Sequence, residues 1–143
     1  MQDLEIAKKR LREKSLTLVA VKSGKTLFET ASHGISGFLE AIEKLGVRLK
    51  GASVADRIAG KAVALLCVYA EVAAVYAEIL SEKGKEVLEK NAIYHEWRDL
   101  VETILDANRA GMCPFEKLAT EISDPFEAYK MFKTLQNSLR RDR

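Results

Sequence analysis

Apolar residues recur at helix or strand spacing through the first part of the chain, and turn residues separate the runs. Leu4, Ala7 and Leu11 fall on one helical face. Two short extended runs then flank Gly24, which suits a tight turn. Helical spacing returns and stops at Gly46, a residue typical of helix ends. The pattern predicts a helix, a β-hairpin and a second helix over residues 3–14, 16–30 and 35–45.

The central segment, Ser53 to Ala70, begins with polar residues and becomes almost wholly apolar. This pattern predicts one helix that the core covers on all sides and that is open at its first turn. Asp56 lies in that turn, and Ser53-x-x-Asp56 is close to a capping box, in which the acid only satisfies helix amides. The alternative is a working carboxylate at the mouth of a pocket, with Arg57 and Lys61 beside it.

The second half alternates extended and helical signals without a linker. A buried strand at 72–80, a short helix at 82–91 and a strand at 93–97 are the signals of a βαβ unit. Further helices are predicted at 99–108, 114–122 and 125–139. The element order predicts one domain, residues 1–143, with an α/β fold: a three-layer α/β/α sandwich with a mixed sheet.

The amino-acid composition limits the kinds of protein that this chain can be. Of the 143 residues, 48% are hydrophobic and 31% charged, with a formal net charge of +2, so strong attraction to nucleic acid is not indicated. The apolar run 62–70 is shorter than a membrane span, and the start of the chain does not resemble a signal peptide. We expect a cytoplasmic protein with no membrane partner and leave self-association open. Few Asn and Gln beside abundant Lys, Glu and Arg resemble thermophilic composition.

The segment Cys113-Pro114-Phe115-Glu116 has an internal counterpart in Asp124-Pro125-Phe126-Glu127. In both, proline and glutamate suit the first turn of a helix, and only the capping residue differs. A helix N-terminus activates a thiol, so Cys113 is a candidate catalytic residue; the alternative is a small buried apolar side chain. Arg109 and Glu116 are candidate ligand contacts beside it.

Val54-Ala55-Asp56-Arg57 resembles the His-Ala-Glu-Arg motif of zinc deaminases, and the element order resembles the cytidine-deaminase-like fold. More closely, the chain resembles a small uncharacterised bacterial domain family of that superfamily. Asp-Arg-Ile-Ala-Gly-Lys-Ala and Gly-Met-Cys-Pro-Phe-Glu carry this resemblance. It spans nearly the whole chain and implies the fold, and it comes with no established activity.

The zinc ligands of deaminases have no counterpart in this sequence. Those enzymes hold the metal through a His or Cys before the acid and a Cys pair after the next strand, and the metal activates a water. Here Val54 and the segment Ser81–Lys85 stand at those places. Other ligand types occur at positions whose spacing predicts no shared site: His33, His95, Cys113 and Glu116. We expect neither a zinc site nor another cofactor.

Three classes of function fit these residues. The favoured one is binding of a small nucleoside- or nucleotide-like molecule without catalytic zinc, in a pocket with Asp56, Arg57, Lys61 and Cys113. The first alternative is a metal-free or divergent hydrolase or deaminase that uses Asp56 and Cys113. The second is a non-enzymatic module that meets a protein or RNA through its basic terminal helices.

Overall fold

A five-stranded mixed sheet forms the centre of the computed structural model, which describes residues 2–32, 35–105 and 113–141. The strand order is β2-β1-β3-β4-β5. Strand β1 runs antiparallel to both β2 and β3, whereas β4 and β5 are parallel to β3. The strands span Leu18–Lys22 (β1), Lys25–Thr30 (β2), Ser53–Ala59 (β3), Ala74–Ser81 (β4) and Tyr94–Val101 (β5).

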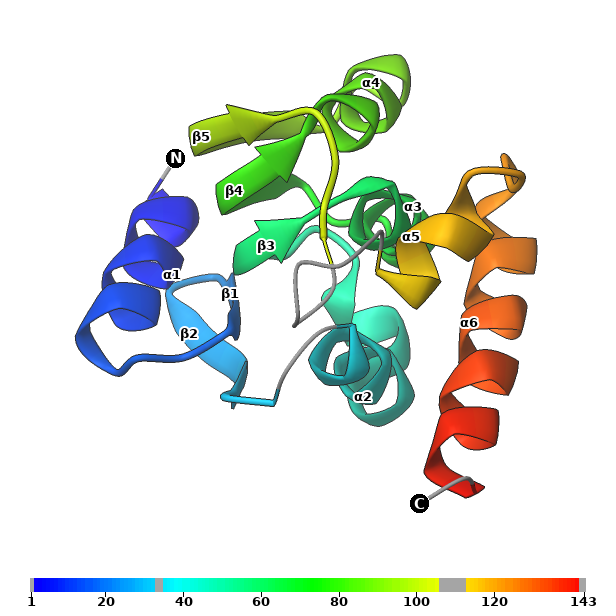
Figure 1. Ribbon diagram of the computed structural model, residues 1–143. Coiled ribbons are helices and arrows are strands. Elements are labelled where there is room, and N and C mark those ends of the chain that lie inside the picture. Colours follow the sequence, from blue (N-terminus) through cyan, green and yellow to red (C-terminus); the bar gives the residue numbers. More distant parts are fainter. Residues whose placement is uncertain (1, 33–34, 106–112, 142–143) are drawn as a thin grey trace.

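Helices cover both faces of the sheet (Figure 1). Helix α1 lies on one face, and α2, α3 and α4 lie on the other, with α5 and α6 packed outside α3. The predicted α/β/α arrangement with a mixed sheet is therefore confirmed. The helices span Gln2–Glu13 (α1), Ser36–Leu45 (α2), Lys61–Ala70 (α3), Glu82–Lys90 (α4), Pro114–Ala119 (α5) and Pro125–Arg141 (α6), and a short 3-10 helix spans Gly46–Leu49 (η1). None of the described helices has the length and apolar character needed to cross a membrane.

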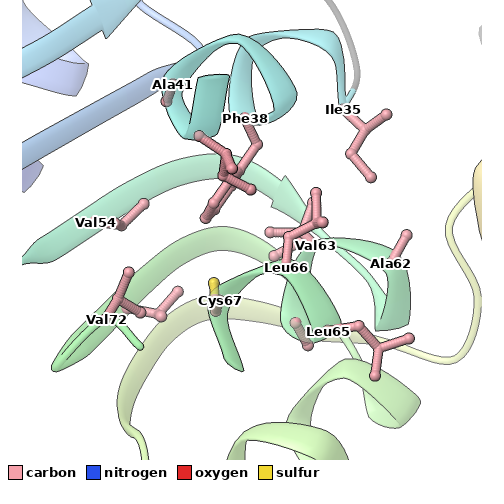
Figure 2. Close-up of a cluster of buried hydrophobic side chains, with 14 of the residues drawn as sticks. Ile35, Phe38, Ala41, Val54, Ala62, Val63, Leu65, Leu66, Cys67 and Val72 are labelled. Atoms are coloured by element: carbon pink, nitrogen blue, oxygen red, sulfur yellow. The ribbon is translucent and has the colours of Figure 1, made fainter. Parts of the chain in front are cut away.

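The main core lies between the sheet and α3. Residues 62–67 of this helix are all buried, and they contact Phe38 of α2 and Val54 of β3 in one apolar cluster (Figure 2). A smaller cluster lies under α1, where Leu4, Ala7 and Leu11 pack on the opposite face of the sheet. This amphipathic face of α1 is the one that the sequence spacing predicts.

The predicted helix at 53–70 is wrong in its first half, because Ser53–Ala59 forms strand β3. This strand lies between β1 and β4 and is buried on both faces over most of its length. Such a strand shows little alternation of apolar and polar residues, so its pattern merges with that of the following helix. The helix itself begins only after Gly60.

The predicted helix at 99–108 is also wrong where the structure describes it, since β5 continues to Val101. Strand β5 is the last in the sheet, and most of its residues are exposed. Charged residues are therefore tolerated along it, and the sequence loses the apolar run that marks an interior strand.

Candidate functional site

Asp56 lies in the middle of β3 and is only 9% exposed. Its register neighbours are Leu18 and Ala77, which belong to the core on the α3 side of the sheet. The carboxylate accepts a hydrogen bond from the Ile58 amide at 3.2 Å, and no ion pair reaches it from the part of the chain that the structure describes. Burial raises the pKa of Asp56 to about 7. The predicted capping box is wrong, because Asp56 belongs to a strand and precedes α3.

The negative charge of Asp56 acts on the thiol of Cys67, which lies on α3. Cys67 is fully buried, as predicted, and burial together with the negative charge of Asp56 raises the pKa of this thiol well above its usual value. An acid and a thiol thus share the core beneath α3. On the sequence alone, Asp56 is paired with Cys113 instead, because Cys113 precedes a predicted helix whose N-terminus would activate its thiol.

Arg57 points to the opposite face of the sheet from Asp56, since neighbouring residues of a strand alternate. Its guanidinium donates to Glu78 at 2.7 Å and to the carbonyl oxygens of Leu16 at 2.6 Å and Leu11 at 3.2 Å. These bonds fasten β3 to the end of α1. The structure therefore does not bring Arg57 to the side of Asp56 where a shared pocket was predicted.

Glu116 meets the first turn of α3. Its carboxylate accepts hydrogen bonds from the amides of Lys61 at 3.0 Å and Ala62 at 2.7 Å. Burial raises the pKa of Glu116, while the two amides and the charges of Lys61 and Lys83 oppose that rise. Gly60 stands at the cap position and has no side chain to satisfy these amides. Glu116 thus caps a helix other than its own.

Two glycines make room for this arrangement. A Cβ atom at Gly60 would overlap the Glu116 carboxylate, and one at Gly84 of α4 would come within 2.9 Å of the Gly60 carbonyl carbon and oxygen. Ser81 caps α4 by accepting from the Gly84 amide at 3.0 Å. The N-terminal ends of α3 and α4 are therefore in close contact, and the Glu116 carboxylate lies against the N-terminal end of α3.

Cys113 stands directly before α5, at the cap position predicted for it. Its carbonyl oxygen accepts from the Lys117 amide at 2.9 Å, but the thiol makes no capping hydrogen bond. The thiol is half-buried. Among the residues that the structure describes, no hydrogen bond or ion pair joins Cys113 to Asp56, and Arg109 and His33 lie outside those residues.

The two cysteines differ in their exposure to solvent, and this difference predicts how fast each thiol reacts with an alkylating reagent. In native protein at pH 7 we expect an alkylating reagent to modify Cys113 and to leave Cys67 unmodified, because Cys67 is fully buried and the pKa of its thiol is raised. Mass spectrometry of the labelled peptides measures both, and unfolding in denaturant should make them equal. Equal labelling in native protein would contradict this.

An open groove of about 730 Å³ runs between α3 and α4. Lys61 and Lys83 lie near the starts of the two helices, and Lys90 lies at the far end of α4. Glu86 and Glu89 also line it, so the groove carries charges of both signs with lysine in the majority. On the sequence alone, Lys61 is a candidate and Lys83 and Lys90 are not, although Lys83 follows the predicted start of the helix at 82–91.

The residues at the two helix starts do not fit a zinc ion. They are Gly60, Lys61 and Ala62 at α3, and Ser81, Glu82 and Lys83 at α4, which supply neither imidazole nor thiolate. Among the residues that the structure describes, no three His, Cys, Asp or Glu side chains form a group that could hold a metal. We derive no chemistry through zinc for this chain.

The structure is similar to that of a DUF1893 family protein, TM1506, from Thermotoga maritima. The TM-score is 0.86 at 26% sequence identity, and the match covers 93% of this chain and 89% of that one. RibD from Acinetobacter baumannii matches with a TM-score of 0.44 at 20% identity over 85% of this chain and 36% of its own, a likeness too weak to carry an argument. A second form of RibD gives a TM-score of 0.45.

No curated protein matches the chain. A family model described as "TM1506: Domain of unknown function (DUF1893)" matches residues 6–136, which include the whole sheet and the groove. The chain therefore belongs to the DUF1893 family.

Proposed function

We propose that this domain binds a small nucleotide-like molecule, without zinc, in the groove between α3 and α4. The observation that carries the proposal is the position of Lys61 and Lys83 at the starts of two neighbouring helices in one open groove. An anionic group there would meet two ammonium charges and the positive end of the α4 dipole, while the Glu116 carboxylate already occupies the start of α3. Glu86 and Asn91 on the same groove supply acceptors and donors for hydroxyl and amino groups.

Thermal unfolding with three related compounds tests this proposal. We expect a nucleoside monophosphate to raise the melting temperature more than the matching nucleoside or inorganic phosphate does, because only the monophosphate offers the anion and the base together. A ligand at about 100 times its Kd stabilises the folded state by about 2.7 kcal/mol. Lys61→Gln combined with Lys83→Gln should abolish the shift.

Lys9→Gln is the matched control, since Lys9 lies on α1 and is exposed. It should keep the full shift. No shift with any of the three compounds, or an undiminished shift in the double variant, would refute binding in this groove.

Metal-free acid-base chemistry is a second candidate, and one observation favours it. The pKa of Asp56 lies near 7, where a group can both give and take a proton efficiently. Asp56 does not line the groove, so a role in proton transfer alone predicts that Asp56→Asn leaves the ligand-induced shift in melting temperature intact and abolishes turnover. A loss of the shift would place Asp56 in binding instead.

The basic residues of α1 give less support to an RNA-binding role. Lys8 pairs with Glu96 at 2.9 Å, Arg10 pairs with Glu29, and Arg12 donates to the Tyr76 hydroxyl at 3.3 Å. These side chains are engaged within the chain, so an acidic partner would have to displace internal contacts. We therefore rank this function below small-molecule binding.

A further inference from the structure

Strand β5 leaves one edge of the sheet open. It pairs with β4 alone in the part of the chain that the structure describes, and Figure 1 shows it at the end of the sheet beside α4. Three large apolar side chains on it are exposed: Tyr94 by 47%, Trp97 by 38% and Leu100 by 41%. Unpaired amides and carbonyl groups beside such side chains form a template for another strand.

In β5, residues at equal distances before and after Trp97 have side chains that suit each other, such as Glu96 and Arg98. We propose that β5 pairs antiparallel with β5 of a second copy of this chain, about a two-fold axis through Trp97, so that two five-stranded sheets become one continuous sheet. An isologous contact of this kind requires each side chain to suit the residue that the two-fold axis places opposite it. The facing pairs are Glu96 with Arg98, His95 with Asp99, Tyr94 with Leu100, and Trp97 with Trp97.

The charges select this register over its neighbours. A shift of two residues would place Arg98 opposite Arg98 in one direction and Glu96 opposite Glu96 in the other. A shift of one residue would set Glu96 against Asp99 in one direction and would separate Glu96 from Arg98 in the other. Opposite charges that face each other across two strands stabilise the pair, and like charges destabilise it. The alignment about Trp97 therefore sets Glu96 opposite Arg98 and brings no like charges face to face.

The side chains of β5 are already held in place on both faces. On the α4 face the His95 and Trp97 rings stack at 5.9 Å between centroids, and the Lys85 ammonium lies 5.5 Å from the Trp97 ring centre. On the α1 face Lys8 donates to Glu96 at 2.9 Å. Ordering these groups beforehand lowers the entropy that pairing would otherwise cost.

The mass in solution, measured by light scattering across a dilution series, tests the proposal. We expect wild-type protein to have twice the chain mass of 15.9 kDa. Glu96→Arg alone, or Arg98→Glu alone, turns two symmetry-related pairs from attractive to repulsive, and should raise the dimer dissociation constant at least about tenfold. The two substitutions together restore opposite charges and should restore the dimer. Thermal melts of each variant separate loss of pairing from loss of folding.

A disulfide test fixes the register. In a Cys113→Ser background, Trp97→Cys should give a cross-linked dimer under mild oxidation, because the two residues face each other on the axis. Asp99→Cys, on the same face of the strand, is the matched control. Its two copies would lie about 13 Å apart along the strands, beyond the reach of a disulfide.

Three results would overturn the proposal. A single-chain mass for wild-type protein at every concentration would mean that the charges of β5 only protect an edge from pairing. A dimer that survives both single charge reversals would place the contact elsewhere. Cross-linking through Asp99→Cys as fast as through Trp97→Cys would refute the register.

Discussion

Replacing Asp56 by asparagine should stabilise this protein at alkaline pH, although the change removes a buried acid from the central strand. The pKa of Asp56 is raised from 3.8 to about 7 by burial, so between these values the folded carboxyl keeps a proton that the unfolded chain has released. Stability contributed by this proton is therefore lost as the pH rises toward 7. The full difference corresponds to roughly 4 kcal/mol as an upper limit.

Urea denaturation at pH 4 and pH 8 measures the effect. Asp56→Asn should match wild type within roughly 1 kcal/mol at pH 4 and exceed it by a few kcal/mol at pH 8, since only the wild type must then hold an unpaired charge in its core. If the variant gains nothing at pH 8, the carboxylate has a partner in the folded protein.

Glu78→Gln is the control, because Glu78 is an equally interior acid with a cation beside it. Its carboxylate is 11% exposed and lies 2.7 Å from the Arg57 guanidinium. Removing that charge should lower stability by roughly 1 to 3 kcal/mol at pH 8, the opposite sign to Asp56→Asn. An acid retained at a cost in stability is expected where function requires it.

Gly60→Ala should destabilise the protein by roughly 3 kcal/mol, because the added methyl group overlaps the Glu116 carboxylate and drives it from the α3 amides. Glu116→Ala should cost roughly 1 to 3 kcal/mol for the unsatisfied amides of Lys61 and Ala62. The double variant should cost much less than the sum, since the three atoms nearest to the added methyl group all belong to that carboxylate. Urea denaturation of the four proteins measures this coupling.

Glu127→Ala is the internal control, since Glu127 occupies the same place in Asp-Pro-Phe-Glu as Glu116 does in Cys-Pro-Phe-Glu. Glu127 is exposed, and Asp124 accepts from its amide at 3.2 Å. Its loss should change the free energy of unfolding by no more than about 0.5 kcal/mol. Equal costs for the two glutamates, or strict additivity of Gly60→Ala and Glu116→Ala, would contradict the capping of α3 by Glu116.

The sequence predicts most of the elements because their apolar residues repeat along one face, as Leu4, Ala7 and Leu11 do in α1. It fails at β3, where burial on both faces removes the alternation that marks a strand. That failure carries over to the site, because a helical Asp56 would lie on the same side as Arg57 and Lys61. In the strand, Asp56 and Arg57 point to opposite faces of the sheet.

The role of Glu116 shows a different limit. Its position in the first turn of α5 follows from the local sequence, and there it has an obvious partner in its own helix dipole. Whether it caps α5 or α3 depends on where α5 packs, which local sequence does not determine. The nearby Gly60 is the one available signal, since a glycine at a helix start leaves amides for a distant group to satisfy.

The cap of α3 also bears on how the chain folds and opens. The acceptor for the Lys61 and Ala62 amides lies 55 and 54 residues later in the chain, on a helix of only six residues. Closing so long a loop is entropically slow, so the first turn of the most buried helix is completed only when α5 docks. In native-state hydrogen exchange, these two amides should report the detachment of α5, while the later amides of α3 report global unfolding.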